Sequence, residues 1–570
     1  MSERIRGNAW KIKWNTWSKK AFERAKQENK LVLLSLAGVW CHWCHVMDET
    51  TYSDEEIINL INENFIPIRV DVDERPDISE RYNFGGFPTF AFLTYEGDVI
   101  TGGTYVPPAQ FKEILKEIIE LSKKGDIKDL IASSVSKKSE IRKGNPNEKI
   151  IWDVVDILIS YFDEGYGGFG IEPKFPFPDA MLFLENMYGI TKKNGFNVMI
   201  KKTLDGMLNG IYDEIEGGFF RYSVTRDWKN PHYEKMLETN ANLLLCYSYY
   251  YFLSGEIKYK EVVDKTANYL LKNLRDKDTG LFYSSQDADE IYYSLNLEER
   301  MKRNPPYIDK NIYSCKNALC AISFLKTGIL LNNEDYINIA LEVSKRLYNE
   351  YLTKEGILHS KNLGISYLDD NVLFLDLLIN LYNYYLDQEY LEKAKIIADI
   401  IVKEYVDFNG LLKDRIPSED SLGLLKEPYH PLNENSLAAK DLYILGELIG
   451  DENLKKISKE ITSILSANYV SYSLFASSFA NSLLFLLDPI EIRLVFSNKD
   501  MAKNIVKENK LILNPFVYIK YIDFNSEKAK QEYNKEGIYV CKGTLCYPPV
   551  HTADELNKLI EKILKENLKF

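Results

Sequence analysis

The chain has few of the residues that mark disulfide-rich, nucleic-acid-binding or membrane proteins. Its 570 residues include only 7 cysteines, too few for a disulfide framework. Basic residues are outnumbered, because 71 lysines and arginines face 84 aspartates and glutamates, for a formal net charge of −13. This excess of negative charge argues against nucleic acids and anionic membranes as partners.

Long apolar runs are also scarce. The opening residues MSERIRGNAWKIKW contain no apolar signal-peptide core. The longest apolar candidate, 474–487, is interrupted by serines and an asparagine, and a membrane span needs about 18 or more apolar residues. The sequence therefore predicts a soluble, cytoplasmic protein with no membrane partner.

The chemistry that is present concentrates in one stretch, LVLLSLAGVWCHWCHVMDET at 31–50. An apolar, branched run predicts a buried strand, and the polar run after it predicts a helix. Cys41 and Cys44 form a Cys-x-x-Cys at this junction, which is typical of a redox dithiol. At a helix N-terminus the dipole favours an anion, so Cys41 is the expected nucleophile and Cys44 the resolving thiol. His42 and His45 are expected to tune the thiolate.

Two other interpretations of this stretch stay open. Isolated cysteines are often inert, small apolar residues. Cys41, His42, Cys44 and His45 are also zinc-competent ligands, although no second ligand pair lies nearby in the sequence. We therefore expect a redox disulfide and no cofactor, with zinc at Cys41, Cys44 and His45 as the minor alternative.

Residues 1–124 predict a thioredoxin fold. Helix, strand, Cys-x-x-Cys helix, strand and then a strand that begins at a proline follow in that order, with a fourth strand starting at 98–100. In such folds the proline that faces the dithiol is cis, and a cis bond before proline costs only about 0.5–1 kcal/mol. We predict that Phe87–Pro88 is cis, that Pro88 packs beside Cys41, and that Trp40, Trp43 and Phe87 help to frame a substrate groove.

The next segments are a predicted linker at 125–147, which is polar and charged, and a helical region at 148–489. Twelve apolar-periodic segments in this region fit six helical hairpins, which can close into an (α/α)6 toroid. A helical solenoid and two separate bundles remain alternatives, although no fixed sequence period supports a solenoid. The apolar run at 372–382 predicts an inner helix of the toroid.

Three connections in the helical region are rich in glycine, aromatic and charged residues, and loops commonly carry binding sites. Aromatic faces together with carboxylates suit sugar rings. Asp287 with Asp289, or Glu234 with either, could form a general acid–base pair. The competing interpretation is a structural network of polar side chains. The candidate residues of this toroid site are Glu172, Lys174, Arg221, Tyr222, His232, Glu234, Lys235, Asp287 and Asp289.

Residues 490–570 predict a small α/β region with two strands at 490–496 and 516–522. Cys541 and Cys546 follow at a spacing too wide for a redox dithiol turn. They could form a small structural disulfide or remain thiols, and thiols are favoured in a cytosolic chain. Cys246, Cys315 and Cys320 lie in predicted helices and are expected in the core.

The motifs CHWCHVM, DVDERPD and GGTYVPP resemble those of the spermatogenesis-associated protein 20 family, also called the YyaL or DUF255 group. The family loop reads Gly-Trp-Pro-Leu, where this chain has Gly86-Phe87-Pro88-Thr89. GYGGFGIEPKFP, GIYDEIEGGFFRYSV, PHYEKMLETNANL and YSSQDADE resemble the family's second domain. That resemblance implies a domain like the six-hairpin glycosidases and N-acylglucosamine 2-epimerases. Asn317, Asp369–Asp370 and Asn435–Ser436 match family positions at the starts of inner helices, where such residues are good caps.

Together these features predict a multidomain chain with an N-terminal α/β thioredoxin fold, a central all-α (α/α)6 toroid and a small C-terminal α/β region. The main functional hypothesis is a thiol–disulfide oxidoreductase acting on protein thiols or disulfides, with a toroid that binds a carbohydrate. One alternative is a sugar epimerase or glycoside-processing enzyme whose thioredoxin domain is regulatory. The other is a non-enzymatic binding scaffold.

Overall fold

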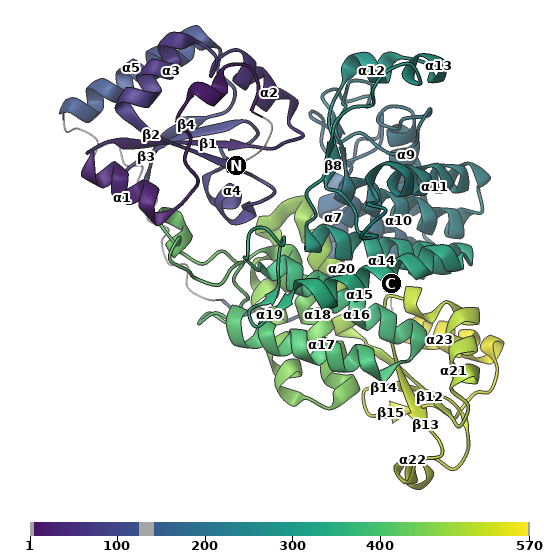
Figure 1. The fold of residues 1–570 in the computed structure, drawn as a ribbon. Helices are drawn as coiled ribbons and strands as arrows, with labels where there is room; N and C mark the ends of the chain where they lie inside the picture. Colours follow the sequence, from purple (N-terminus) through teal and green to yellow (C-terminus); the bar gives the residue numbers. More distant parts are fainter. Residues whose placement is uncertain (1–4, 125–141, 568–570) are drawn as a thin grey trace. The chain divides into compact units, whose positions relative to one another are not determined.

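The computed structural model describes residues 5–124 and 142–567, and these form two compact units (Figure 1). Unit 1 contains the described part of Met1–Glu140 together with Ser285–Asp309 and Asp414–Tyr429. Unit 2 contains Ile141–Ser284, Lys310–Lys413 and His430–Phe570 as far as they are described. The predicted linker 125–147 lies mostly outside the described residues. The predicted boundaries placed 285–309 and 414–429 in the helical region, whereas the contacts group both segments with unit 1.

Unit 1 is built on a four-stranded sheet in the order β2-β1-β3-β4. The strands are β1 (Leu31–Ala37), β2 (Phe65–Asp71), β3 (Thr89–Leu93) and β4 (Val99–Gly103). β2 pairs with β1 in parallel, and β3 pairs antiparallel with both β1 and β4. Every residue of β1 and β2 is buried. β1 is apolar except for Ser35, whereas β2 carries the charged residues Arg69 and Asp71 among its apolar residues. This order confirms the predicted thioredoxin fold.

Helices cover both faces of this sheet, with α3 and α5 on one side and α1 and α4 on the other (Figure 1). The helices of the N-terminal segment are α1 (Lys19–Gln27), α2 (His42–Glu49), α3 (Glu55–Asn64), α4 (Pro76–Tyr82) and α5 (Pro108–Lys124). α2 is the Cys-x-x-Cys helix, so the fold places the dithiol where β1 ends.

The two later segments of unit 1 carry short elements. Within 285–309, β8 (Ser285–Gln286) pairs with β9 (Ile308–Asp309), and α12 (Glu290–Ser294) and α13 (Leu297–Arg300) lie between them. The segment 414–429 contains the short helix η4 (Gly423–Lys426). An ion-pair cluster anchors this segment, because Arg415 reaches Asp77 at 2.7 Å and Arg75 reaches Asp420 at 2.7 Å.

Unit 2 contains twelve long helices that form a closed ring. Six inner helices contact one another in the cyclic order α8, α10, α14, α16, α18 and α20, and α20 closes back onto α8. Each packs mainly against one outer helix, in the order α9, α11, α15, α17, α19 and α7. This closed arrangement is an (α/α)6 toroid, as predicted, and α16 is an inner helix.

The ring helices match the twelve predicted segments one for one. Their bounds are α7 (Glu148–Tyr161), α8 (Pro178–Thr191), α9 (Asn194–Leu208), α10 (Leu237–Ser254), α11 (Ile257–Tyr269), α14 (Ser314–Leu331), α15 (Glu334–Tyr351), α16 (Leu368–Tyr385), α17 (Gln388–Ile400), α18 (Leu432–Ile449), α19 (Glu452–Asn468) and α20 (Ala476–Leu487).

By length and composition, two stretches of unit 2 could cross a membrane, Ser314–Leu331 and Glu452–Leu487. The sequence predicted no membrane span, because polar residues interrupt its apolar runs, but the mean hydropathy of these two stretches is high enough. The first stretch is inner helix α14, and 78% of it is buried inside the protein. The second comprises α19, η5 (Tyr469–Phe475) and α20, with a break at Ser473, whose φ is 51°. Both stretches are therefore packing elements of the ring.

Unit 2 ends in a small mixed sheet with the order β13-β12-β14-β15. Its elements are β12 (Ile490–Phe496), α21 (Lys499–Asn509), β13 (Val517–Asp523), α22 (Glu527–Glu532), β14 (Gly537–Lys542), β15 (Leu545–Cys546) and α23 (Ala553–Asn567). β12 pairs in parallel with β13 and antiparallel with β14. This sheet therefore repeats the strand order and directions of the sheet in unit 1, which the sequence did not predict.

Candidate functional site

The dithiol lies at the N-terminus of α2. Cys41 is the residue that caps this helix, and its Sγ accepts a hydrogen bond from the Cys44 backbone N–H at 3.2 Å. Cys41 and Cys44 form a disulfide in this structure. After reduction, the same N–H and the helix dipole would face the Cys41 sulfur and favour its thiolate.

Aromatic side chains surround the dithiol. Trp40 is buried, and its indole N–H donates to Asp73 at 2.8 Å. The Trp40 ring also packs edge-on against Phe87, with 6.1 Å between ring centroids. Phe87–Pro88 is cis, as predicted. Trp43, in contrast, leaves 43% of its surface exposed beside the two cysteines, so it is available to a partner.

His45 connects the dithiol helix to the segment 285–309. Its Nε2 donates to the Val39 carbonyl at 2.9 Å, and its Nδ1 lies 3.8 Å from Asp287 Oδ2. Arg6 donates to the same Asp287 oxygen at 3.1 Å. Asp287 therefore belongs to the surroundings of the dithiol in unit 1, whereas the sequence analysis placed it in the toroid site.

Asp289, the predicted partner of Asp287, lies at the start of α12. Its Oδ1 accepts the Tyr292 N–H at 2.9 Å and caps α12. Asp and Asn are good caps because they accept orphan N–H groups, and this local role accounts for the residue. Asp289 thus caps α12, whereas Asp287 contacts His45 and Arg6.

A buried carboxyl group lies at the end of β2, next to β1. Asp71 pairs in register with Ala37, and its Oδ1 accepts the backbone N–H groups of Asp73 and Glu74. Burial, reinforced by the charge of Asp73, raises the pKa of Asp71 well above its ordinary value.

In unit 2, two of the predicted toroid residues are buried ion pairs. Lys174 donates to Asp163 at 2.5 Å, and Lys235 donates to Asp213 at 2.8 Å. Both lysine side chains are fully buried. Each also donates to a glycine carbonyl of its own loop. Through these contacts, Lys174 and Lys235 hold the loops that precede α8 and α10 in place.

Four other predicted residues of unit 2 come together. The rings of Tyr222 and His232 stack with 4.4 Å between centroids, and His232 Nδ1 lies 3.7 Å from Glu234. Burial opposes ionisation of Glu234, but His232 and Arg221 outweigh it and hold its pKa below the ordinary value. Glu172 lies apart from this group on an exposed turn, where it accepts the Arg226 N–H at 3.3 Å.

A recurring asparagine contact that the sequence did not predict holds the loops of unit 2 to the inner helices. The fourth residue of α10, α14, α16 and α18 is asparagine in each case, and each binds the backbone of the loop strand before its helix. These residues are Asn240, Asn317, Asn371 and Asn435. Asn317 and Asn435 were expected to cap their own helices, but their amides instead hold Phe282 and Leu412. The sequence does carry a signal for this contact, because an asparagine recurs at the fourth position of four inner helices.

We expect Asn240→Ala to destabilise unit 2 by about 2 to 5 kcal/mol. Asn240 accepts the Phe219 N–H at 2.6 Å and donates to the carbonyls of Phe219 and Met236. Its loss leaves buried backbone groups unpaired, at roughly 1–3 kcal/mol each. Urea unfolding followed by circular dichroism measures the change. Asn349→Ala, on the exposed face of α15, is the control and should shift stability by less than about 0.5 kcal/mol; equal shifts would contradict the prediction.

The ring also encloses a cavity of about 410 Å³. All six inner helices line it, and 512–517 contribute at the edge of the C-terminal sheet. Its polar groups include an ion pair between Lys440 and Asp376 at 3.1 Å and a hydrogen bond between Asn186 and Asn481 at 2.9 Å. Burial lowers the pKa of Lys326, which also lines the cavity. None of the predicted toroid residues lines this cavity. The prediction considered only the loops, since the inner faces of the helices were expected to be filled by packing.

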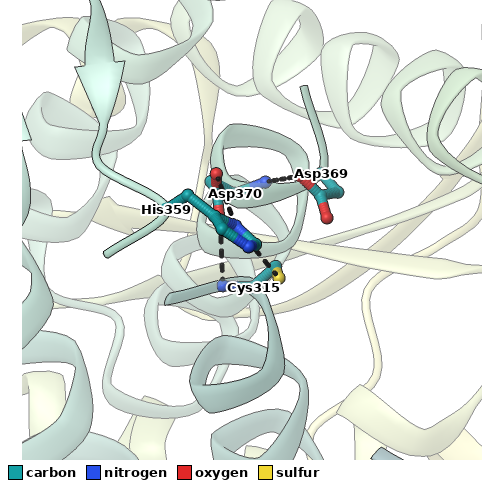
Figure 2. A group of neighbouring side chains, drawn as sticks. All are labelled: Cys315, His359, Asp369 and Asp370. Carbon is teal, nitrogen blue, oxygen red and sulfur yellow. Dashed lines mark hydrogen bonds and ion pairs between the residues drawn. The ribbon is translucent and has the colours of Figure 1, made fainter. Parts of the chain in front are cut away.

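A further group was missed where α14 and α16 begin. Cys315, His359, Asp369 and Asp370 lie close together (Figure 2), and their ligand atoms all lie within 4.8 Å of each other. His359 Nδ1 is 2.9 Å from Asp370 Oδ1 and 3.8 Å from Cys315 Sγ. Burial and the neighbouring Asp370 raise the pKa of Asp369 to about 6. Asp370 Oδ2 also accepts the Tyr367 N–H, which confirms its expected capping role.

The C-terminal cysteines differ from the expectation. Cys541 and Cys546 form a disulfide between the paired strands β14 and β15. The sequence favours free thiols here, because cytosolic proteins usually keep their cysteines reduced. The hairpin instead brings the two residues directly opposite each other, with 4.0 Å between their Cα atoms.

Comparison with known families assigns the N-terminal segment. Residues 5–139 match the family model Thioredox_DsbH, described as "Protein of unknown function, DUF255". The N-terminal segment carries a DUF255 domain. This domain contains the Cys41–Cys44 disulfide and the sheet of unit 1. The match confirms the resemblance of the N-terminal motifs to the DUF255 group.

The DUF255-containing chain also resembles two curated proteins. It is 36% identical over 307 residues to an uncharacterized protein of Caenorhabditis elegans, and 34% identical over 307 residues to spermatogenesis-associated protein 20 of Homo sapiens. Each match covers 49% of this chain, and 42% and 39% of the two relatives. The aligned part thus spans less than half the length of the curated relatives it matches.

Among solved structures, a D-mannose isomerase is similar to the chain, with a TM-score of 0.47 and 13% identity. The match covers 56% of this chain and 84% of that chain. The (α/α)6 assignment of unit 2 rests on its own closed ring of helix contacts.

Proposed function

We propose that the DUF255 domain is a thiol–disulfide oxidoreductase whose nucleophile is Cys41. The observation that carries the proposal is the Cys41 sulfur at the helix N-terminus, paired with Cys44 and receiving its N–H. Thiolate reactivity is favoured by such a position. The substrate class is a protein disulfide, or in the reverse direction a protein dithiol.

The reaction proceeds by two exchanges. The Cys41 thiolate attacks one sulfur of the substrate disulfide, forms a mixed disulfide and releases the other substrate sulfur as a thiolate. The Cys44 thiolate then attacks Cys41, which releases the second substrate thiol and leaves the Cys41–Cys44 disulfide. Two electrons pass to the substrate, and an external dithiol must reduce the protein for another turnover. Trp43, which is exposed beside the dithiol, would contact the substrate chain.

Trapping the mixed disulfide tests this proposal. In Cys44→Ser, the resolving thiol is absent, so we expect a covalent complex with a disulfide-containing protein such as insulin. The complex should be detected by non-reducing electrophoresis and dissolve on adding dithiothreitol. Cys246→Ser, which removes a buried thiol of unit 2, is the control and should trap nothing. Failure of Cys44→Ser to trap any substrate would count against Cys41 as the nucleophile.

A second candidate function is carbohydrate binding in unit 2, and the ring cavity is the observation that favours it. Its volume of about 410 Å³ falls within the usual range of ligand pockets, roughly 300–1,000 Å³. Its amide, carboxylate and ammonium groups suit a small molecule with several hydroxyls. Tyr222, His232 and Glu234 supply further polar and aromatic groups on the loops of the same unit.

Calorimetric titration with mono- and disaccharides tests this second candidate. Asn242 lines the cavity, so Asn242→Leu should weaken binding at least about tenfold, because one good hydrogen bond contributes about 1.4 kcal/mol. Asn349→Leu, on the exposed face of α15, should leave binding unchanged. Absence of binding to the unmodified protein across the panel would contradict the carbohydrate proposal and leave the redox proposal intact.

A further inference from the structure

The group of Cys315, His359, Asp369 and Asp370 has the donor atoms of a metal site. The four side chains come from three places in unit 2: the first turn of α14, the loop before α16, and the first turn of α16 (Figure 2). Thiolate and imidazole ligands select late transition metals such as zinc over calcium or magnesium. Zinc bound tetrahedrally by such ligands has bonds of about 2.0–2.3 Å.

The separations between the donor atoms fit one such ion. Bonds of that length at tetrahedral angles place ligand atoms roughly 3.2 to 3.8 Å apart. Cys315 Sγ lies 3.8 Å from His359 Nδ1, and that nitrogen lies 2.9 and 3.2 Å from the two Asp370 oxygens. All four ligand atoms lie within 4.8 Å of one another. To share one centre, the closest pair, His359 and Asp370, would move slightly apart, and the longest separations would shorten by about 1 Å.

Charge and burial also point to a cation. Cys315, His359 and Asp370 are buried, with exposures of 6%, 2% and 0%. Asp370 Oδ1 lies 2.9 Å from Nδ1 of His359, a ring that carries positive charge only when it is protonated. Two adjacent carboxylates are costly to bury without compensating positive charge. A divalent ion would supply that charge, and Asp369, which is only partly buried, would give it a route from solvent.

The surrounding residues hold the ligands in place. The carboxylate of Asp370 accepts the Ser314 hydroxyl at 2.7 Å and the Cys315 N–H at 3.1 Å. The His359 ring stacks on Tyr313 at 4.8 Å and meets Tyr367 edge-on at 5.1 Å. Partners that fix the ligands are typical of metal sites, where they set ligand orientation.

We propose that Cys315, His359, Asp369 and Asp370 bind one Zn²⁺ ion in unit 2. His359 Nδ1 and Cys315 Sγ are its nitrogen and sulfur ligands, and one oxygen from each aspartate completes a tetrahedral shell. The ion joins the starts of two inner helices to the loop between them. This site is independent of the dithiol in unit 1.

Cobalt substitution tests the site with a direct readout. The full chain carrying Cys41→Ser, Cys44→Ser, Cys541→Ser and Cys546→Ser retains three cysteines, all in unit 2, of which only Cys315 belongs to the group. Titration of this parent variant with Co²⁺ should produce a thiolate-to-cobalt charge-transfer band and the visible bands of tetrahedral cobalt. The bands should saturate at one ion per chain and disappear when Zn²⁺ is added.

Matched variants separate this site from other thiols. Adding Cys315→Ser should abolish the charge-transfer band, whereas Cys320→Ser, in the same helix, should retain it. Asp369→Asn, at the partly buried ligand, should weaken cobalt binding at least tenfold, and circular dichroism checks that each variant is folded. Lack of a charge-transfer band in the parent would overturn the proposal. A band that survives Cys315→Ser would also overturn it.

Discussion

Replacing Cys41 with serine is expected to lower the rate of disulfide exchange to the uncatalysed background. The serine hydroxyl is not ionised at neutral pH, so the first exchange cannot begin, whereas Cys41 is placed where its thiolate is favoured. The measurement is turnover of insulin reduction by the full chain with dithiothreitol as reductant. Cys41→Ser should be as inactive as a reaction without protein.

Two comparisons make this result specific. Because a disulfide constrains the unfolded chain, the stability of Cys41→Ser is compared with that of the reduced protein, and the two should unfold together. Cys320→Ser removes a buried thiol of unit 2 and should keep full activity. Substantial turnover by a folded Cys41→Ser protein would show that the dithiol does not carry the reaction.

Asp48→Ala is expected to destabilise unit 1 by about 3 to 5 kcal/mol. Asp48 lies on the Cys-x-x-Cys helix, and Arg69 on β2 binds both of its carboxylate oxygens, at 2.7 and 2.9 Å. Both side chains are buried, with exposures of 1% and 6%. Removing one partner of a buried ion pair leaves the other charge uncompensated, which typically costs 3–5 kcal/mol. Urea unfolding monitored by tryptophan fluorescence measures the loss.

The neighbouring Glu49 provides the control for this prediction. Glu49 is half-exposed and contacts Arg6 at 3.4 Å, so Glu49→Ala should change stability by less than about 0.5 kcal/mol. The double variant Asp48→Ala with Arg69→Met removes the unpaired charge and should recover part of the loss. If Asp48→Ala is as mild as Glu49→Ala, the pair does not anchor the dithiol helix to the sheet.

The sequence predicted those features that arise from local patterns. The apolar run of β1 followed by Cys41 and Cys44 identified the dithiol, and the order of strands identified the thioredoxin fold. The twelve helices of unit 2 were also predicted, because each carries its own apolar periodicity. Phe87–Pro88 could be predicted as cis because the fold places a cis proline at that point of the chain.

The features that were missed depend on which distant residues meet. Asp287 lies in a segment far from Cys41 in the sequence, yet it contacts His45 and Arg6, and no local pattern reports such a pairing. The same holds for Cys315, His359 and Asp370, whose spacing matches no common metal motif. The Cys541–Cys546 disulfide follows from the pairing of β14 with β15, which the spacing alone did not reveal.

A redox titration of Cys41 and Cys44 against glutathione tests the central claim most directly. The full chain carrying Cys541→Ser and Cys546→Ser keeps this pair as the disulfide of the described structure. We predict a reversible two-electron transition between about −270 and −180 mV, the range from thioredoxin to protein disulfide isomerase. A disulfide that never forms reversibly, or one with a potential below about −300 mV, as in structural disulfides, would contradict the oxidoreductase account.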